Sequence, residues 1–252
     1  MEIIKEEHIV QNGNRKIYGK WFFPKEKAIK GAVILSHGYN GIHEDFDYEC
    51  TTFAQNGYLA YAFDFCGGSV RTKSTDLKTT EMTLYTERDD LLAVFKDIAS
   101  NEKAFGKKIF LFGGSQGGLV SALALEELQD AVSAAALYYP AFNIPDDWRK
   151  NFPTADDIPE TKELMEMTLG KCYFEAIRDF DVFDYIGRYK NPLLIIYGDK
   201  DELVPEEALR KAMKKYTDVK LVILDGEAHG FTAEGCKLAM RNIIDFFNNI
   251  LK

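Results

Sequence analysis

The sequence predicts an α/β fold, in which helices cover both faces of a mostly parallel sheet of eight strands. Short apolar runs typical of buried strands alternate with longer segments of helical periodicity along the chain. Hydrophobic residues make up 46% of the 252 residues, which is enough material for one large core. We therefore expect a single domain over residues 1–252.

The first two strands are expected to form an antiparallel edge of the sheet. Residues 7–10 and 16–23 are joined by a segment containing Asn12-Gly13, a dipeptide typical of hairpin turns. The later apolar runs are typical of strands buried on both faces, and they lie at residues 32–36, 58–63, 108–112, 132–139, 192–198 and 219–224. Helical patterns lie between them, at residues 47–56, 81–99, about 118–128, 205–216 and 234–251.

One segment interrupts this alternation. Residues 141–188 separate two sheet strands by far more chain than a single crossover helix needs, and they contain three prolines, many carboxylates and several aromatic side chains. A long excursion inside a compact domain is usually functional. We interpret this segment as a lid inserted over the carboxyl ends of the strands.

Composition excludes several classes of partner. The formal net charge of −9 disfavours binding to nucleic acid or to an anionic membrane. The four cysteines form no C-x-x-C pair and no metal-ligand spacing, so we expect reduced thiols. The sequence contains neither a signal peptide nor an apolar stretch long enough to span a membrane, and a cytoplasmic protein is expected.

A strand-to-helix turn carries a candidate nucleophile. The segment Gly113-Gly114-Ser115-Gln116-Gly117 matches the pattern G-x-S-x-G between a predicted buried strand and an apolar helix. In such a turn the serine has a positive φ, and side chains two residues before or after it would collide with neighbouring backbone. The hydroxyl of Ser115 then stands at a helix N-terminus. The alternative is a glycine-rich turn in which the serine only caps the helix.

A serine hydroxyl needs a base to become nucleophilic, and the base needs an acid to orient it. His229 is the only histidine that follows Ser115, and it lies in the loop after the last predicted strand. The loop after the preceding strand offers three acids. Asp201 is favoured because it lies far enough along the loop to reach His229, whereas Asp199 and Glu202 are alternatives that would otherwise be solvated turn residues.

Two backbone N–H groups are expected to bind an oxyanion. One belongs to Gln116, directly after the serine, and the other to Tyr39, in the loop His37-Gly38-Tyr39-Asn40-Gly41 after the strand 32–36. The glycines of this loop allow close approach of backbone to a reacting carbonyl. We interpret His37 as a structural residue whose ring hydrogen-bonds neighbouring loops, rather than as a second base.

With these residues in place, the sequence resembles the α/β-hydrolase superfamily and, within it, the bacterial cinnamoyl or feruloyl esterases. The matching stretches span nearly the whole chain in the same order. They are residues 37–41, 64–69, 113–118, 198–205 and 229–231, together with the end of the lid at 169–174.

The resemblance implies the α/β-hydrolase fold and the hydrolysis of carboxylic esters through an acyl-enzyme, without a metal or an organic cofactor. It also implies an acyl pocket formed partly by the lid. Trp148, Tyr173 and Phe174, with Tyr39, are candidates to line an aromatic pocket, and the alternative for the lid residues is ordinary lid packing. The lid is shorter than in these esterases and acidic at its start. The resemblance therefore leaves open whether the acyl group of the substrate is a hydroxycinnamoyl group.

Two other functions remain to be distinguished. The first is a different acyl hydrolase on the same fold, which includes thioesterases, lipase-like enzymes and peptidases. The second is a protein without catalytic activity that uses the pocket to bind a small ligand, although such a protein has no need of a serine, a histidine and an acid together. A homodimer is expected only by analogy with the family.

Overall fold

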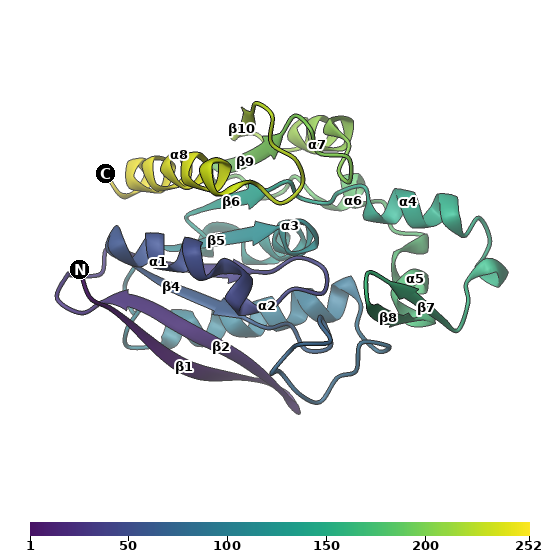
Figure 1. The fold of residues 1–252 in the computed structure, drawn as a ribbon, viewed down its shortest axis with the longest axis horizontal. Helices are drawn as coiled ribbons and strands as arrows, with labels where there is room; N and C mark the ends of the chain where they lie inside the picture. Colours follow the sequence, from purple (N-terminus) through teal and green to yellow (C-terminus); the bar gives the residue numbers. More distant parts are fainter.

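The computed structural model describes residues 1–252 and is built on an eight-stranded sheet (Figure 1). The strand order is β1 (Ile3–Asn12), β2 (Arg15–Pro24), β4 (Tyr58–Phe63), β3 (Gly31–Ser36), β5 (Ile109–Gly114), β6 (Ala134–Tyr138), β9 (Leu193–Gly198) and β10 (Val219–Leu224). Only β2 runs against its neighbours, and all other adjacent pairs are parallel. The predicted fold class is confirmed.

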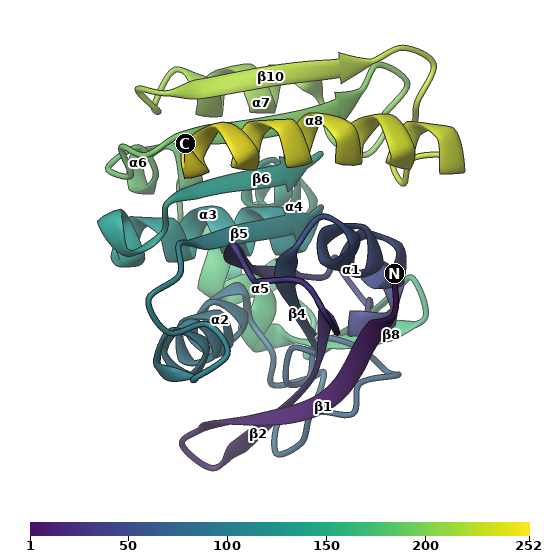
Figure 2. The ribbon, with the colours of Figure 1, turned by 90° about the vertical axis from the view of Figure 1, so that its left-hand side faces the viewer.

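The hairpin of β1 and β2 forms one edge of the sheet, and β10 forms the other (Figure 2). The predicted turn is present: Asn12 pairs with Arg15, and Gly13 between them has a φ of 61°. Glycine adopts this left-handed backbone conformation without steric cost, which is why an Asn-Gly dipeptide marks the turn.

Helices cover both faces of the sheet. Helices α1 (Asp47–Gln55) and α8 (Ala233–Leu251) lie on one face, and α2 (Leu84–Ser100), α3 (Gln116–Leu128) and α7 (Glu206–Met213) lie on the other (Figure 1). Each buried strand contributes side chains to the core on both faces of the sheet, because successive side chains point to opposite faces. In β3, for example, Ile34 joins the core under α2 and α3, whereas Val33 and Leu35 join the core under α1 and α8.

Helix α2 begins later than the apolar pattern predicts. The predicted start at residue 81 is wrong, because Thr83 caps the helix and its side chain accepts a hydrogen bond from the backbone N–H of Thr86. Helix α7 likewise ends at Met213, three residues before the predicted end. No helix combines the length and the apolar character that crossing a membrane requires.

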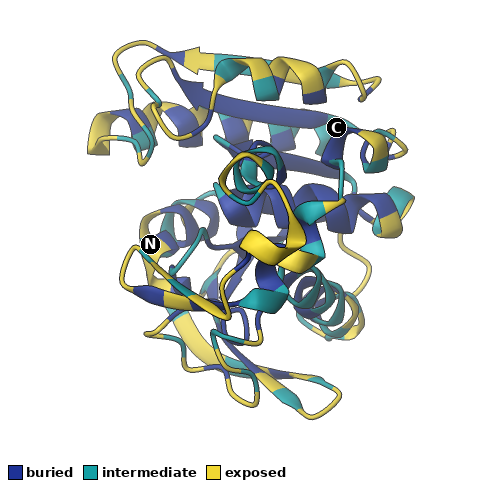
Figure 3. Ribbon diagram, turned by 90° about the vertical axis from the view of Figure 1, so that its right-hand side faces the viewer, coloured by how far each residue is buried: buried dark blue, intermediate teal, exposed yellow.

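Residues 141–188 lie beyond the carboxyl ends of the parallel strands (Figure 1). They form α4 (Ile144–Asn151), a 3-10 turn at Ala155–Asp157, the hairpin of β7 (Thr161–Leu164) and β8 (Met167–Gly170), α5 (Lys171–Arg178) and α6 (Val182–Tyr185). Seen from this end, much of the segment is exposed or half-buried, while the strands behind it are buried (Figure 3). We call residues 141–188 the lid.

Candidate active site

The turn between β5 and α3 has the strained backbone expected of a nucleophile elbow. Ser115 has φ 53° and ψ −121°, outside the regions that serine normally occupies. A Cβ on Gly113 would lie 2.5 Å from the carbonyl oxygen of Gly117, and a Cβ on Gly117 would overlap the carbonyl oxygens of Ser36 and His37. Both glycines are therefore required by close backbone packing, as predicted from the motif.

Gly117→Ala is expected to lower the free energy of unfolding by about 3 kcal/mol, because the backbone of β3 must shift to admit the methyl group. Urea denaturation measures this loss. Gly114→Ala is the matched control, since its Cβ would meet only the edge of the Phe46 ring, 3.1 Å away, and a smaller loss is expected. Equal stability of the Gly117 variant and the native protein would contradict the packing argument.

The structure brings together the three side chains that the sequence singles out. Nε2 of His229 lies 2.9 Å from Oγ of Ser115, and Nδ1 lies 2.8 Å from Oδ2 of Asp201. Because a carboxylate only accepts hydrogen bonds, Nδ1 carries the ring proton and Nε2 accepts from the serine hydroxyl. The Asp201 side chain is fully buried, whereas that of His229 is 18% exposed and open to the pocket.

Asp201 is held in place by its own loop. Its Oδ1 accepts the backbone N–H groups of Leu203 and Val204, each at 2.9 Å, which leaves Oδ2 for the histidine. The two alternative acids point elsewhere. Asp199 accepts the N–H of Gly226 at 2.7 Å, and Glu202 is exposed.

His37 lies close to the elbow, but both nitrogens of its ring hydrogen-bond backbone groups. Its Nδ1 donates to the carbonyl oxygen of Gly38 at 2.7 Å, and its Nε2 accepts the N–H of Phe65 at 3.0 Å. Burial lowers the pKa of the His37 imidazole, which favours the neutral ring. The structural role predicted for His37 is confirmed, and this ring has no free nitrogen for proton transfer.

The loop that carries Tyr39 faces the elbow. A Cβ on Gly38 would lie 3.2 Å from Cβ of Ser115, so the loop passes close to the serine. The N–H of Tyr39 donates to no protein acceptor, and Gln116 is the first residue of α3, so its N–H has no acceptor within the helix. Both predicted donors are therefore free for a ligand beside Ser115.

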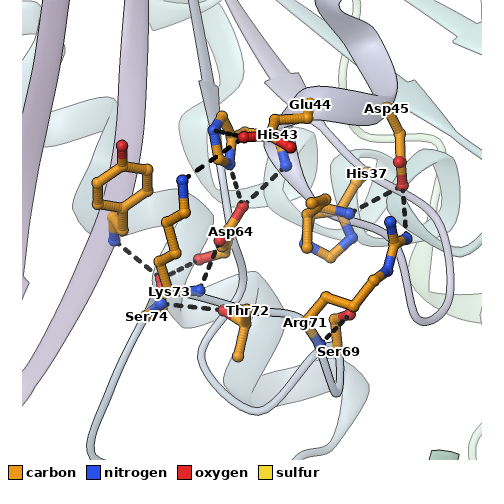
Figure 4. A network of polar contacts seen from close by, with 12 residues as sticks. His37, His43, Glu44, Asp45, Asp64, Ser69, Arg71, Thr72, Lys73 and Ser74 are labelled. Atoms are coloured by element: carbon orange, nitrogen blue, oxygen red, sulfur yellow. Dashed lines mark hydrogen bonds and ion pairs between the residues drawn. The ribbon is translucent and has the colours of Figure 1, made fainter.

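The loop that carries Ser69 and Arg71 holds the Tyr39 loop in place, and Figure 4 shows Arg71 directed toward Asp45. Asn40 has a φ of 52°, and its carbonyl oxygen accepts from Ser69 Oγ and from the guanidinium of Arg71, both at 3.1 Å. Arg71 also reaches the carboxylate of Asp45 at 3.3 Å. The contacts of Ser69 and Arg71 hold the backbone carbonyl of Asn40 in place.

A buried histidine–aspartate pair anchors the same two loops (Figure 4). Nδ1 of His43 donates to Oδ1 of Asp64 at 2.6 Å, and both side chains are fully buried. Asp64 also accepts the backbone N–H of His43 and that of Lys73, each at 2.8 Å. This carboxylate therefore satisfies donors from both loops.

A cavity of about 490 Å³ opens in front of Ser115 and His229. Its lid residues include Trp148 and Tyr173, as predicted, and also Asp147, Leu164 and Met165. This volume lies within the range of pockets that enclose a drug-sized ligand.

Phe174 does not line the cavity. It is 1% exposed and packs edge-on against Trp148, with ring centroids 4.7 Å apart. On α5 the neighbouring Tyr173 faces the cavity, so Phe174 points into the lid core instead. For this residue, lid packing is the role that the structure supports.

A chain of buried hydrogen bonds lies behind the elbow and was not foreseen from the sequence. The Tyr173 hydroxyl donates to Oε1 of Gln116 at 2.8 Å, and Nε2 of Gln116 donates to Oε2 of Glu87 at 2.9 Å. Glu87 is 1% exposed, and burial raises the pKa of its carboxyl group to about 8. The charge of Asp90, on the same helix, also raises the pKa of Glu87. A charge on Glu87 would in turn raise the pKa of the Tyr39 and Tyr173 phenols.

Glu87→Gln is expected to stabilise the protein at alkaline pH. In the native protein the folded state keeps the Glu87 proton up to about pH 8, whereas the unfolded chain loses it near 4.5. The contribution of this group to stability is full below pH 4.5, falls between pH 4.5 and about pH 8, and is constant above that. The variant lacks this dependence, so its advantage should grow by about 4 kcal/mol from about pH 4.5 to about pH 9.

Thermal unfolding at several pH values measures the difference between Glu87→Gln and the native protein. A difference that does not change with pH would contradict the buried, protonated state of Glu87.

Comparison with protein families supports the same fold. A family model described as serine aminopeptidase, S33, matches residues 27–177, which is more than half of the chain. The chain belongs to this family of hydrolases. The matched range includes the Tyr39 loop, the elbow at Ser115 and most of the lid.

Solved structures of hydrolases match this S33-family chain over nearly its full length. Est1E from Butyrivibrio proteoclasticus, in a structure with ferulic acid bound, is 26% identical with a TM-score of 0.87, and the match covers 97% of this chain and 99% of that one. The esterase Pf2001 from Pyrococcus furiosus is 21% identical with a TM-score of 0.75, over 99% and 94% of the two chains. The resemblance to feruloyl esterase-like α/β hydrolases is confirmed.

Two curated relatives match part of their own length. The caffeoylshikimate esterase of Arabidopsis thaliana is 30% identical over 142 residues, covering 54% of this chain and 41% of the relative. The acylamino-acid-releasing enzyme of Mus musculus is 22% identical over 196 residues, covering 71% and 25%. This S33-family chain therefore spans less than half the length of the curated relatives it matches.

Proposed function

We propose that this hydrolase is a serine carboxylesterase that cleaves small esters of aromatic acids through an acyl-enzyme on Ser115. One observation carries the proposal. The hydroxyl of Ser115 lies 2.9 Å from a histidine ring nitrogen, the other nitrogen of that ring lies 2.8 Å from a buried carboxylate, and the serine and the histidine line a cavity. This is the arrangement that makes a serine hydroxyl nucleophilic.

The first half-reaction forms the acyl-enzyme. Oγ of Ser115 attacks the ester carbonyl while Nε2 of His229 takes the hydroxyl proton, and the carbonyl electrons move onto oxygen. The N–H groups of Tyr39 and Gln116 bind this oxyanion, and Asp201 stabilises the imidazolium. When the carbonyl re-forms, the carbon–oxygen bond to the alcohol breaks and His229 protonates the leaving oxygen.

The second half-reaction releases the acid. Water attacks the acyl carbonyl while Nε2 of His229 takes a proton from it, and the same two N–H groups bind the second oxyanion. Collapse of this intermediate breaks the bond to Oγ, which regains its proton from His229. Apart from the ester and one water molecule, each step uses only the side chains and backbone groups described.

The cavity supports an aromatic acyl group. Its walls combine the rings of Tyr39, Phe46, Tyr139, Trp148 and Tyr173 with a few polar groups, among them Asn143 and Asp147 of the lid. Flat rings favour a planar acyl chain through stacking and edge contacts. Two similar proteins are described with hydroxycinnamoyl compounds, Est1E with ferulic acid and the plant caffeoylshikimate esterase by its name.

A substrate panel tests this function. We expect kcat/KM for methyl ferulate and methyl caffeate to exceed that for methyl esters of aliphatic acids of similar length by at least roughly tenfold. Trp148→Ala should remove most of this preference, because the indole supplies aromatic wall area. Phe152→Ala is the matched control, since Phe152 stacks on the far side of Trp148 and lies outside the cavity lining.

The same panel distinguishes the alternatives. Preferential cleavage of thioesters, of long-chain aliphatic esters or of aminoacyl anilides would replace the proposed substrate class with a thioesterase, a lipase or a peptidase. Binding of ferulic acid without turnover of any of these compounds would favour a binding protein and contradict the esterase proposal.

A further inference from the structure

Each of the two residues expected to bind the oxyanion also contacts the lid through its side chain. The phenol of Tyr39 donates to the carbonyl oxygen of Leu164 at 3.0 Å, and it also reaches that of Met167 at 3.4 Å. Both carbonyls belong to the β7–β8 hairpin. Gln116 accepts from the hydroxyl of Tyr173, on α5, at 2.8 Å. One backbone donor is thus tied to the hairpin and the other to a lid helix.

The hydrogen bond between Gln116 and Tyr173 is buried, and the side chains at both of its ends are held in place. Gln116 and Tyr173 are each 1% exposed. The side-chain oxygen of Gln116 accepts from the Tyr173 hydroxyl and its nitrogen donates to the Glu87 carboxyl group, so both ends of the amide are hydrogen-bonded. A buried polar network of this kind resists displacement, because each broken bond leaves a buried group unpaired.

Asn40, the neighbour of Tyr39, adds a further hydrogen bond between this loop and the lid hairpin. The amide of Asn40 donates to the carbonyl oxygen of Met165, at the tip of the same lid hairpin, at 3.0 Å. Asn40 is also the residue whose carbonyl is held by Ser69 and Arg71. The backbone of the Tyr39 loop is therefore held between the lid on one side and the 64–75 loop on the other.

We propose that the lid sets the position of both oxyanion-binding N–H groups, through the Tyr173–Gln116 bond and the bonds of Tyr39 to the lid hairpin. Tyr173 and the Tyr39 hydroxyl are then positioning groups for the reaction. The inference rests on the proposed function, because it requires an oxyanion on the reaction path. It follows that the lid contributes to the rate of the chemical step as well as to acyl-group binding.

The experiment uses an ester whose acyl group is too small to fill the cavity. Hydrolysis of nitrophenyl acetate is measured for Gln116→Ala, which keeps the backbone N–H, for Tyr173→Phe and for the double variant. We expect each single variant to lower kcat roughly tenfold to a hundredfold with KM within about twofold of the native value, because misplaced groups weaken the transition state most. The double variant should be no slower than Gln116→Ala, since both changes break one connection.

Two further measurements separate positioning from general loss of structure. The affinity for butylboronic acid, which forms a tetrahedral adduct with a reactive serine, should fall by the same factor as kcat. Tyr39→Phe removes the hydrogen bonds of Tyr39 to the lid hairpin, at a half-buried site where folding is not at risk. Tyr216→Phe is the control: it removes a buried hydroxyl that has no hydrogen-bond partner, and it should leave kcat within about twofold.

The outcomes are distinguishable. If the native protein hydrolyses the ester and Gln116→Ala and Tyr173→Phe match the Tyr216→Phe control, the coupling is overturned while the proposed function stands. Additive losses in the double variant, or a change in KM without a change in kcat, would also overturn it. If the native protein neither hydrolyses esters nor binds the boronic acid, the proposed function fails and the coupling fails with it.

Discussion

Ser115→Ala is expected to lower kcat for ester hydrolysis by on the order of 10⁶-fold. The hydroxyl that lies 2.9 Å from Nε2 of His229 is lost, and no other hydroxyl hydrogen-bonds that nitrogen. Labelling of the protein by a fluorophosphonate should disappear with the activity. The variant should fold normally, because the smaller side chain leaves the strained backbone turn and its glycine contacts in place.

Ser100→Ala provides the matched control for this variant. Ser100 is exposed at the end of α2, and its hydroxyl contacts only the backbone of its own helix. Activity and labelling should both match the native protein. Labelling that persists in Ser115→Ala would assign the reactive nucleophile to another residue.

Asp201→Asn is expected to lower kcat by roughly 10⁴-fold through a change of histidine tautomer. The side-chain oxygen of the asparagine will keep the N–H groups of Leu203 and Val204, so its NH₂ group must face Nδ1 of His229. An NH₂ group needs an acceptor, which places the imidazole proton on Nε2 instead. Nε2 then cannot accept the proton of Ser115, although the geometry is preserved.

Two observations check this explanation of Asp201. Asp199→Asn changes the neighbouring acid, which contacts the Gly226 backbone and not the histidine, and it should retain native activity. The thermal unfolding of both variants should resemble that of the native protein. A large loss of activity in Asp199→Asn, with Asp201→Asn fully active, would exchange the roles of the two carboxylates.

The sheet and the elbow were predictable from the sequence because local pattern determines them. The bounds of β4 and β10 were predicted without error, since each is a short β-branched or aromatic run between turn residues. At the elbow, the steric need for Gly113 and Gly117 is a local property of one turn. The choice of Asp201 over Asp199 also followed from the distance that each acid must span along one loop.

The interior of the lid could not be predicted in this way. Strands β7 and β8 have only four residues each, and the turn between them uses Met165 and Glu166 at φ values of 43° and 65°, without a glycine to mark it. The helices α4 and α5 have eight residues each, which is too short for a clear periodic pattern.

The supporting contacts of the site depend on tertiary structure. Tyr173 and Gln116 are separated by 57 residues, and Gln116 and Glu87 by 29, so no local spacing connects them. From the sequence, Glu87 is expected to be one more exposed polar residue of α2. Its burial is visible only in the folded structure. Phe174 was expected in the pocket as one of the aromatic residues of the lid, yet adjacent helical residues face different directions, and only its neighbour Tyr173 lines the cavity.

The mass of the protein during turnover tests most directly whether Ser115 carries the acyl group. A nitrophenyl ester of ferulic acid is mixed with the native protein, the reaction is quenched in acid, and peptides are analysed by mass spectrometry. We expect a feruloyl increment on the peptide containing Ser115, formed in a burst and lost on longer incubation. Turnover of the ester with no acyl adduct at any time, or with the adduct on another residue, would rule out Ser115 as the acylated residue.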